Sequence, residues 1–406
     1  MKRVIFLVPV ILFFLLISNV YSQWFPQTSG TTSILRGVSF TDANNGTAVG
    51  NMGTILRTIN GGTNWTSQTS GTANDLFCVC FTDSNTGTAV GLYGTILRTT
   101  NGGINWTIQT SGTTYWLLSV FFTDSNTGTV VGEDGTILRT TNGGTNWISQ
   151  TSGTTNLLLG VYFNNANTGT VVGDVGTILR TTNGGANWVS QYSGIATYLR
   201  GVCFTDSNTG TAVGLYGKIV RTTNGGINWI SQLSGTTNWL SSVSFTDSNT
   251  GTVVGEDGKI LRTTNGGTNW SSQISGTLYP LYEVFFTDAN NGTAVGAPGT
   301  ILRTTNGGVF VKYISSKIHE RFSLYQNYPN PFNPATNIKF DIQKTSPTKL
   351  IVYDALGREV ATLVNEVLSA GSYEVNFGGG DYTSGVYFYR LQAGDYVETR
   401  KMLLIK

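Results

Sequence analysis

Two pairs of adjacent acids carry the residue types best suited to hydrolytic chemistry. They are Glu133-Asp134 and Glu256-Asp257, which occupy the same place in two copies of a repeated segment. Glycoside hydrolases use two carboxyl groups, one as an acid and one as a base or nucleophile. Adjacent acids at a turn are more often solvated than catalytic. We therefore expect no catalytic residues and keep a hydrolase using loop carboxylates only as an alternative.

Other reactive side chains are scarce. His319 is the single histidine, which argues against histidine-based triads and histidine-bound metals. Cys78 and Cys80 are too close along a strand to bond to each other, and Cys203 belongs to a distant repeat, so we expect free thiols. The segment 83–87 resembles the start of a calcium loop but lacks the later glycine and glutamate ligand, which favours a plain turn. The sequence predicts no metal and no cofactor.

A 41-residue repeat organises most of the chain. Each unit contains four short β-prone runs, such as 119–122, 128–132, 135–141 and 146–153, separated by turn clusters that include Asn-Gly. Four strands in about 41 residues is the size of one propeller blade. The repeat is marked by seven evenly spaced tryptophans: Trp24, Trp65, Trp106, Trp147, Trp188, Trp229 and Trp270.

The two ends of the repeat predict a closed ring. Trp24–Gly30 matches a fourth strand with nothing before it, whereas the last unit supplies strands one to three and has Val311 where a tryptophan is due. The first segment can therefore complete the last blade, which removes exposed sheet edges. We predict a seven-bladed β-propeller over residues 23–309, with an open β-solenoid as the alternative.

The third-to-fourth strand hairpin resembles known propeller repeats. The pattern Thr99-x-Asn101-x-Gly103-x-Asn105-Trp106 is similar to a degenerate Asp-box (BNR) of sialidase-type propellers. The longer string GTILRTTNGGxNW, after AVG or VVG, resembles the repeats of the photosystem II assembly-factor family. The resemblance implies a propeller in which the Asp-box and the periodic tryptophans are structural. Sialidase activity would require a non-repeated arginine cluster, but nearly all propeller arginines are periodic, Arg36 and Arg200 excepted.

Comparison of the seven copies separates two faces. The strand 1–2 and 3–4 turns are almost invariant, whereas the strand 2–3 turns and the inter-blade loops vary and are rich in aromatics. Rigid rings on loops suit glycan stacking or protein contact. Alternatively, the rings fill the channel or pack between blades, and duplication of 79–156 as 202–279 explains part of the pattern. The candidate ligand-binding residues are Tyr93, Tyr115, Trp116, Tyr198, Tyr216, Trp239 and Tyr279.

After a linker at 310–324, the composition changes and residues 325–406 form alternating β-runs that predict an Ig-like β-sandwich. The motifs at 328–334, 352–363, 369–375, 384–391 and 401–406 closely resemble the type IX secretion system C-terminal sorting domain. The resemblance implies export through an outer-membrane translocon, with the secretion machinery as a partner, and display at the bacterial cell surface.

Residues 1–22 read as a signal peptide: a basic start, an apolar run and small residues before Gln23. An uncleaved anchor is the alternative, although the apolar run is short for a membrane span. The net charge of +2 does not favour a nucleic-acid partner. We expect a secreted, surface-attached monomer without enzymatic activity that binds glycan or protein; the alternatives are a hydrolase and an assembly-factor-like protein binder.

Overall fold

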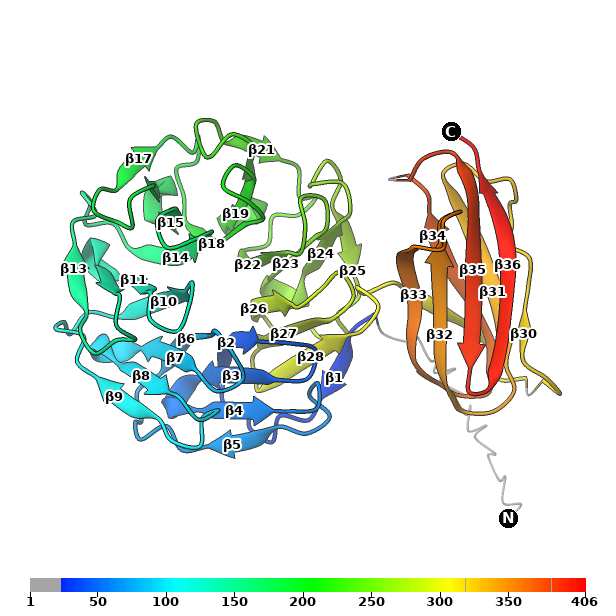
Figure 1. Cartoon of the computed structure of the whole chain (residues 1–406), viewed down its shortest axis with the longest axis horizontal. Helices are drawn as coiled ribbons and strands as arrows, with labels where there is room; N and C mark the ends of the chain where they lie inside the picture. The colour runs from blue at the N-terminus through cyan, green and yellow to red at the C-terminus, as the bar shows by residue number, and fades with distance from the viewer. Residues whose placement is uncertain (1–22, 318, 381) are drawn as a thin grey trace, which may run out of the picture.

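The computed structural model describes residues 23–317, 319–380 and 382–406, and the predicted signal peptide lies outside the described residues. The chain forms a ring of seven four-stranded antiparallel sheets followed by a β-sandwich (Figure 1). The first strands of successive blades lie side by side around the centre, and β26 (Leu281–Phe286) of the last blade contacts β2 (Leu35–Phe40) of the first. The structure is therefore a closed seven-bladed propeller.

The strands of the blades follow chain order. Blades one to three contain, besides β2, the strands β3 (Gly46–Gly50), β4 (Ile55–Thr58), β5 (Thr66–Gln68), β6 (Leu76–Phe81), β7 (Gly87–Gly91), β8 (Ile96–Thr99), β9 (Thr107–Gln109), β10 (Leu117–Phe122), β11 (Gly128–Gly132), β12 (Ile137–Thr140) and β13 (Ile148–Gln150). Blades four to six contain β14 (Leu158–Phe163), β15 (Gly169–Gly173), β16 (Ile178–Thr181), β17 (Val189–Gln191), β18 (Leu199–Phe204), β19 (Gly210–Gly214), β20 (Ile219–Thr222), β21 (Ile230–Gln232), β22 (Leu240–Phe245), β23 (Gly251–Gly255), β24 (Ile260–Thr263) and β25 (Ser271–Gln273).

The seventh blade closes the ring in the way that the sequence indicates. Its sheet contains β26, β27 (Gly292–Gly296), β28 (Thr300–Thr304) and, from the start of the propeller, β1 (Phe25–Gln27). β1 pairs antiparallel with β28. In blades one to six, a short 3₁₀ turn joins the second strand to the third: η1 (Asn51–Gly53), η2 (Leu92–Gly94), η3 (Glu133–Gly135), η4 (Asp174–Gly176), η5 (Leu215–Gly217) and η6 (Glu256–Gly258).

A glutamine three residues after each periodic tryptophan joins neighbouring blades. In blade two, Trp106 donates its indole N–H to Oε1 of Gln68 in blade one at 3.3 Å. The amide of Gln68 in turn donates to the Gly102 carbonyl at 3.0 Å. The next residue, Gly103, has φ +85°, and a Cβ there would lie 2.0 Å from Oε1 of Gln68. The second glycine of each Asn-Gly-Gly turn is thus required by both conformation and space.

The periodic arginine makes a second contact between blades. Arg139 donates to Oγ1 of Thr129 in its own blade at 2.6 Å and to the Ala166 carbonyl of the next blade at 2.5 Å. Its guanidinium lies 4.7 Å from the ring centre of Phe163. The same contacts recur around the ring, so these arginines hold the scaffold together.

The C-terminal part forms two packed four-stranded sheets. One has the strand order β29-β34-β31-β30 and the other β33-β32-β35-β36. The predicted linker 310–324 already contains two of these strands, because Val311 is buried and β29 pairs with β34 through alternating apolar and polar residues. The strands are β29 (Val311–Ser315), β30 (Ser323–Leu324), β31 (Ala335–Ile342), β32 (Ser346–Tyr353), β33 (Glu359–Leu368), β34 (Gly371–Gly378), β35 (Gly385–Ala393) and β36 (Tyr396–Leu404).

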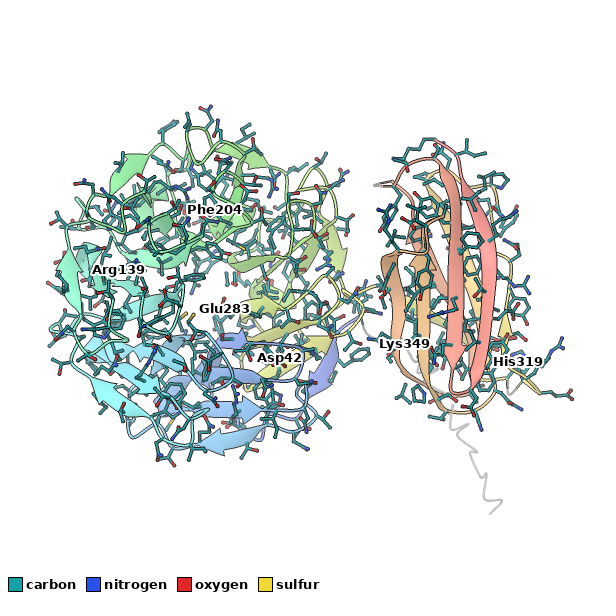
Figure 2. The ribbon with its side chains drawn as sticks, in the orientation of Figure 1. Asp42, Arg139, Phe204, Glu283, His319 and Lys349 are labelled. Carbon is teal, nitrogen blue, oxygen red and sulfur yellow. The ribbon has the colours of Figure 1, made fainter. Side chains whose placement is uncertain are left out.

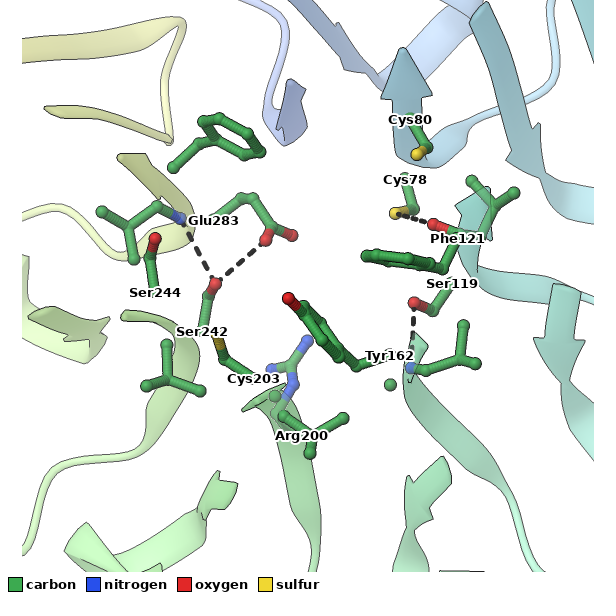
Figure 3. A pocket seen from close by; sticks show the side chains of 18 of the residues that line it. Cys78, Cys80, Ser119, Phe121, Tyr162, Arg200, Cys203, Ser242, Ser244 and Glu283 are labelled. Atoms are coloured by element: carbon green, nitrogen blue, oxygen red, sulfur yellow. Dashed lines mark hydrogen bonds between the residues drawn. The ribbon is translucent and has the colours of Figure 1, made fainter. Parts of the chain in front are cut away.

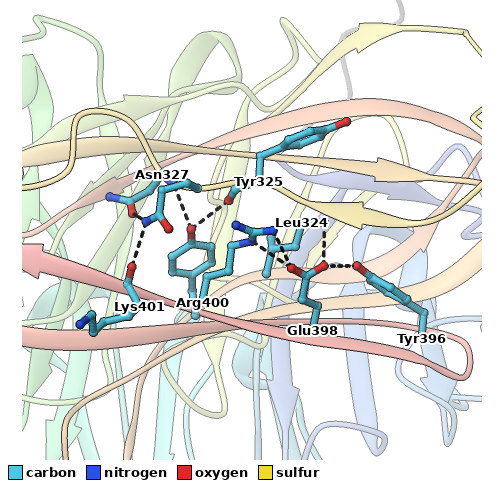
Figure 4. Close-up of polar contacts among 9 residues, drawn as sticks. Leu324, Tyr325, Asn327, Tyr396, Glu398, Arg400 and Lys401 are labelled. Carbon is cyan, nitrogen blue, oxygen red and sulfur yellow. Dashed lines mark hydrogen bonds and ion pairs between the residues drawn. The ribbon is translucent and has the colours of Figure 1, made fainter.

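Polar contacts fasten the start of the sandwich to its last two strands, β35 and β36 (Figure 4). Glu398 on β36 accepts a hydrogen bond from the backbone of Leu324 and pairs with Arg400. The hydroxyl of Tyr389 donates to the Tyr325 carbonyl at 2.9 Å and accepts from the Asn327 backbone at 2.8 Å. The last strand is therefore an integral part of the sandwich.

The sandwich touches the propeller at the 3–4 hairpin of blade seven. The Thr305 hydroxyl donates to the Asn365 carbonyl at 2.5 Å, and the Asn365 amide donates to the Thr305 carbonyl at 3.2 Å. The amide of Asn306 donates to the Leu363 carbonyl at 3.4 Å, and Asn306 is buried. These contacts lie on the face of invariant turns and leave the variable face free. Within the described ranges, no helix is long and apolar enough to span a membrane.

Loss of a periodic tryptophan should weaken the ring strongly. Trp229 is buried, packs edge-on against Phe204 with ring centres 6.0 Å apart, and is bonded to Gln191. Trp229→Ala should lower the free energy of unfolding by about 3–5 kcal/mol, because it opens a cavity and orphans the glutamine. Ile230→Ala, at a neighbouring position that is mostly exposed, should change it by no more than about 0.5 kcal/mol. Equal effects in denaturant titrations would refute this assignment.

Candidate binding face and channel

The invariant face is built from turns that satisfy their own polar groups. Asp83 accepts hydrogen bonds from the backbones of Asn85 and Thr86 at 2.8 and 2.9 Å. These contacts explain the calcium-like segment as a turn held by its first carboxylate. Among the described residues, no cluster of histidine, cysteine and acidic side chains could hold a metal ion.

The opposite, variable face exposes all seven predicted aromatic side chains. Their exposed fractions range from 37% for Tyr198 to 64% for Tyr93. The structure therefore does not bury these rings between blades. They lie on six loops, since Tyr115 and Trp116 are neighbours. Together these rings form a discontinuous aromatic rim, the residues being Tyr93, Tyr115, Trp116, Tyr198, Tyr216, Trp239 and Tyr279.

The tips of the 2–3 turns on this face are conformationally strained. Six tip residues have φ between +52° and +57°, although none is glycine: Met52, Tyr93, Asp134, Val175, Tyr216 and Asp257. This region favours glycine or asparagine, and a β-branched valine there is a true outlier. A turn selected only for folding would carry glycine at these tips. The side chains present are instead large or charged, which points to a role outside the fold.

In each acidic pair, at least one carboxylate accepts a hydrogen bond from a neighbouring rim loop. Glu133 accepts a hydrogen bond from the Trp116 backbone at 2.9 Å, so it fixes the loop that presents that ring. In the duplicated copy, Asp257 accepts from the Asn238 side chain at 2.8 Å. The pairs occupy η3 and η6, in blades three apart. This arrangement supports the rim loops. It does not place two carboxyl groups on either side of one glycosidic bond, as a glycoside hydrolase requires.

A second ring of variable residues lines the channel mouth below the aromatic rim. It is the second residue of each first strand, and the sequence comparison singled out only Arg36 and Arg200 from it. The mouth holds a cavity of about 420 Å³. Arg36 donates to Asn51 at 2.7 Å, and its guanidinium lies 5.4 and 5.2 Å from the ring centres of Phe77 and Tyr282. Arg36 is thereby fixed in position with its charge beside the channel.

Glu283 is the functional candidate that the sequence comparison missed. It points toward the centre of the ring (Figures 2 and 3). The Ser242 hydroxyl donates to its Oε1 at 3.0 Å. Burial raises the pKa of Glu283 to about 7, whereas the bond from Ser242 and the charge of Arg200 oppose the rise. The sequence did contain a clue, because the equivalent position in the other six copies carries a small, uncharged residue. These residues are Gly37, Cys78, Ser119, Gly160, Gly201 and Ser242.

The channel interior continues below Glu283 as a cavity of about 180 Å³. Tyr162 stacks at a tilt against Phe121, with ring centres 4.7 Å apart, and its hydroxyl points inward (Figure 3). Burial raises the pKa of the free thiol of Cys78 to about 12, and of Cys80 and Cys203 to about 11. These thiols stay protonated at neutral pH and are therefore poor nucleophiles.

Comparison with known proteins identifies both parts of the chain. Residues 17–108, 70–152 and 191–280 match the family model described as photosynthesis system II assembly factor YCF48, and together they cover more than half of the chain. Residues 326–406 match the secretion system C-terminal sorting domain. No curated protein matches the sequence.

Solved structures share the propeller fold at low sequence identity. One, described as YCF48 bound to D1 peptide, is 21% identical with a TM-score of 0.61 and covers 70% of this chain and 96% of its own. Another, YCF48 from Cyanidioschyzon merolae, is 20% identical with a TM-score of 0.60 and covers 69% of this chain and 98% of its own.

Relief of the strain at a tip should stabilise the protein. Tyr216 has φ +57°, so Tyr216→Gly should raise the free energy of unfolding by up to about 1 kcal/mol. Tyr192→Gly is the control, because Tyr192 is exposed without a positive φ, and it should lower stability by roughly 0.5–1 kcal/mol. Chemical unfolding of both variants measures the difference, and destabilisation by Tyr216→Gly would show that the tip serves the fold.

Glu283 should make stability depend on pH between its unfolded and folded pKa values. The pKa rises from 4.5 to about 7 on folding, so the stabilising contribution is complete below pH 4.5 and is lost as pH rises through 7. The difference in unfolding free energy between wild type and Glu283→Gln should shift by roughly 3 kcal/mol over that window. Parallel stability profiles for the two proteins would contradict this.

Proposed function

The chain belongs to the photosystem II assembly factor YCF48 family, and from this premise we propose that its propeller is a non-enzymatic module that binds a segment of a protein partner. The partner lies on the variable face, across the aromatic rim and the channel mouth. The secretion sorting domain directs the chain to export and surface attachment. A photosystem client does not fit such a location, so the partner is an extracellular or surface protein.

The observation that carries this proposal is the contrast between the two faces. The invariant turns are internally bonded, while the opposite face combines seven exposed rings with six strained tips. Large aromatic side chains dominate binding energy in protein interfaces, and rigid rings lose little entropy when a partner docks. Strain maintained at six equivalent tips is costly to the fold and is understandable if the tip side chains contact something else.

Charge favours a protein segment over a neutral glycan. The channel mouth presents two guanidinium groups, Arg36 and Arg200, together with the carboxylate of Glu283. A polypeptide offers acidic, basic and apolar groups that match such a mixed surface, whereas a neutral glycan offers no charged group to pair with the guanidinium groups or the carboxylate. The solved relative described as bound to a peptide indicates that this fold can hold one. Glycan binding remains an outcome that the experiment distinguishes.

Selection of ligands from two defined libraries tests the proposal. The full chain would be screened against displayed random twelve-residue peptides and, in parallel, against a glycan array. We expect the selection to enrich peptides that bind the wild-type chain. The affinity of these peptides should fall at least tenfold in the Trp116→Ala and Trp239→Ala variants. Ile148→Ala is the matched control, since Ile148 is an exposed apolar residue on β13, away from the rim, and it should bind as wild type does.

Two results would overturn the proposal. One is glycan binding that depends on Trp116 and Trp239, with no enriched peptides, which would make the face a glycan receptor. The other is release of product from a bound glycan, with Glu133→Gln and Glu256→Gln inactive, which would favour the hydrolase alternative.

A further inference from the structure

The channel mouth has a mainly apolar side and a side that carries both of its guanidinium groups. Blades two to four line it mainly with apolar side chains, which are Phe77, Leu92, Trp116, Leu118, Leu157 and Leu159. Two carboxylates also line this side, Asp75 and Glu133, and each accepts a hydrogen bond from a loop backbone, that of Met52 and of Trp116 respectively. Blades five to seven and blade one line it with Arg200, Ser241, Tyr282, Glu283 and Arg36. A cavity with this division fits a small molecule that has an apolar body on one side and charged groups on the other.

The two cavities are continuous. Five residues line both the mouth and the interior: Leu118, Leu159, Arg200, Ser241 and Glu283. Arg200 and Glu283 therefore stand at the junction, below the aromatic rim, whereas Arg36 lines the mouth alone. A ligand at this level would lie inside the ring, at a different depth from a protein segment lying across the rim.

Opposite charges face this junction without neutralising one another directly. Arg200 and Glu283 each influence the pKa of the other, so they lie within electrostatic reach. Across the described residues, however, every ion pair belongs to the C-terminal sandwich, and none joins Arg200 to Glu283. One carboxylate oxygen of Glu283 is bonded to Ser242, and the other has no hydrogen-bond partner in the described structure. A positive and a negative group are thus presented to a shared space.

The fold does not require these charges. At the position of Glu283, the other six blades carry glycine, serine or cysteine. At the position of Arg36 and Arg200, the other blades carry leucine, serine or an aromatic residue. Burying ionisable groups without a direct partner costs free energy. Their presence around the same cavity, from three different blades, is explained by a bound molecule that pairs with each.

We propose that the channel mouth binds a free α-amino acid with an apolar side chain. Its carboxylate pairs with Arg200 and Arg36, its ammonium group pairs with Glu283, and its side chain lies against Leu118 and Leu159. This site shares Arg36, Arg200 and Glu283 with the channel mouth across which the protein segment is proposed to lie, but it is tested with free small ligands and therefore stands whether or not the rim binds a protein.

Selectivity among four ligands tests the site directly. Calorimetric titration of the full chain would use L-leucine, N-acetyl-L-leucine, L-leucinamide and L-aspartate. We expect leucine to bind at least tenfold more tightly than each of the other three. The acetyl group removes the ammonium charge, the amide removes the carboxylate, and aspartate replaces the apolar body with a charge.

Equal binding of leucine and N-acetyl-leucine would overturn the proposal, because the acetylated molecule mimics the last residue of a peptide. Such a result would indicate a site for a chain terminus that ignores Glu283. Absence of leucine binding at millimolar concentration would also overturn it, because the cavity would then serve water alone.

Two variants should change selectivity in opposite ways. Glu283→Gln should abolish the preference for leucine over N-acetyl-leucine, and Arg200→Gln should abolish the preference for leucine over leucinamide. A folding defect would weaken all ligands together and leave the ratios unchanged, which would count against the assigned roles. Ile148→Ala is the control, since Ile148 is an exposed residue on β13 that belongs neither to the rim nor to the cavity lining, and it should bind leucine normally.

Discussion

The bond between each periodic tryptophan and the glutamine of the preceding blade is the constraint on which the ring depends. Because Gln27 on the first strand serves Trp65, and Gln273 serves Trp24, the contacts run around the whole circle and cross the closure point. The glutamine is seated only if the second glycine of the Asn-Gly-Gly turn is retained. Tryptophan, glutamine and glycine therefore recur together, and the 41-residue period cannot drift without breaking a blade contact.

This repeated contact leaves other positions free to vary. The inner first strands pack against one another around the channel, but their channel-facing side chains differ from blade to blade, so the repeated blade contacts do not fix which residues stand there. The strained tips of the 2–3 turns are a stronger case than the other variable positions, because their backbone conformation reduces stability while most of them keep large side chains exposed. The sandwich docks at the invariant hairpin of blade seven, and this placement keeps the variable face open. Scaffold and recognition are thus assigned to different residues of the same 41-residue unit.

Much of the fold could be predicted from the sequence because the seven copies of the repeat can be compared with one another. The β-propeller, its closure by the segment at Trp24 and the sorting domain all follow from spacing and motifs, and the structure and family comparisons agree with them. The segment at Val311 was expected to be a linker, since two strands interrupted by a charged stretch give little alternation to detect. The exposed rim residues could be named from the sequence, but Glu283 could not. Its importance depends on its side chain pointing into the channel, and the sequence of a single repeat does not show which strand positions point inward.

The account rests on the claim that the variable residues serve recognition and not folding, and one unfolding measurement tests it directly. A multiple variant would replace Tyr93, Val175 and Tyr216 with glycine, Arg36 and Arg200 with leucine, and Glu283 with serine, as in the other blades. Thermal unfolding should give a midpoint equal to or above that of the wild type, because strain and buried charge are removed. A midpoint lower by roughly 5 °C or more would correspond to a loss of one to two kcal/mol and would show that these residues hold the ring together.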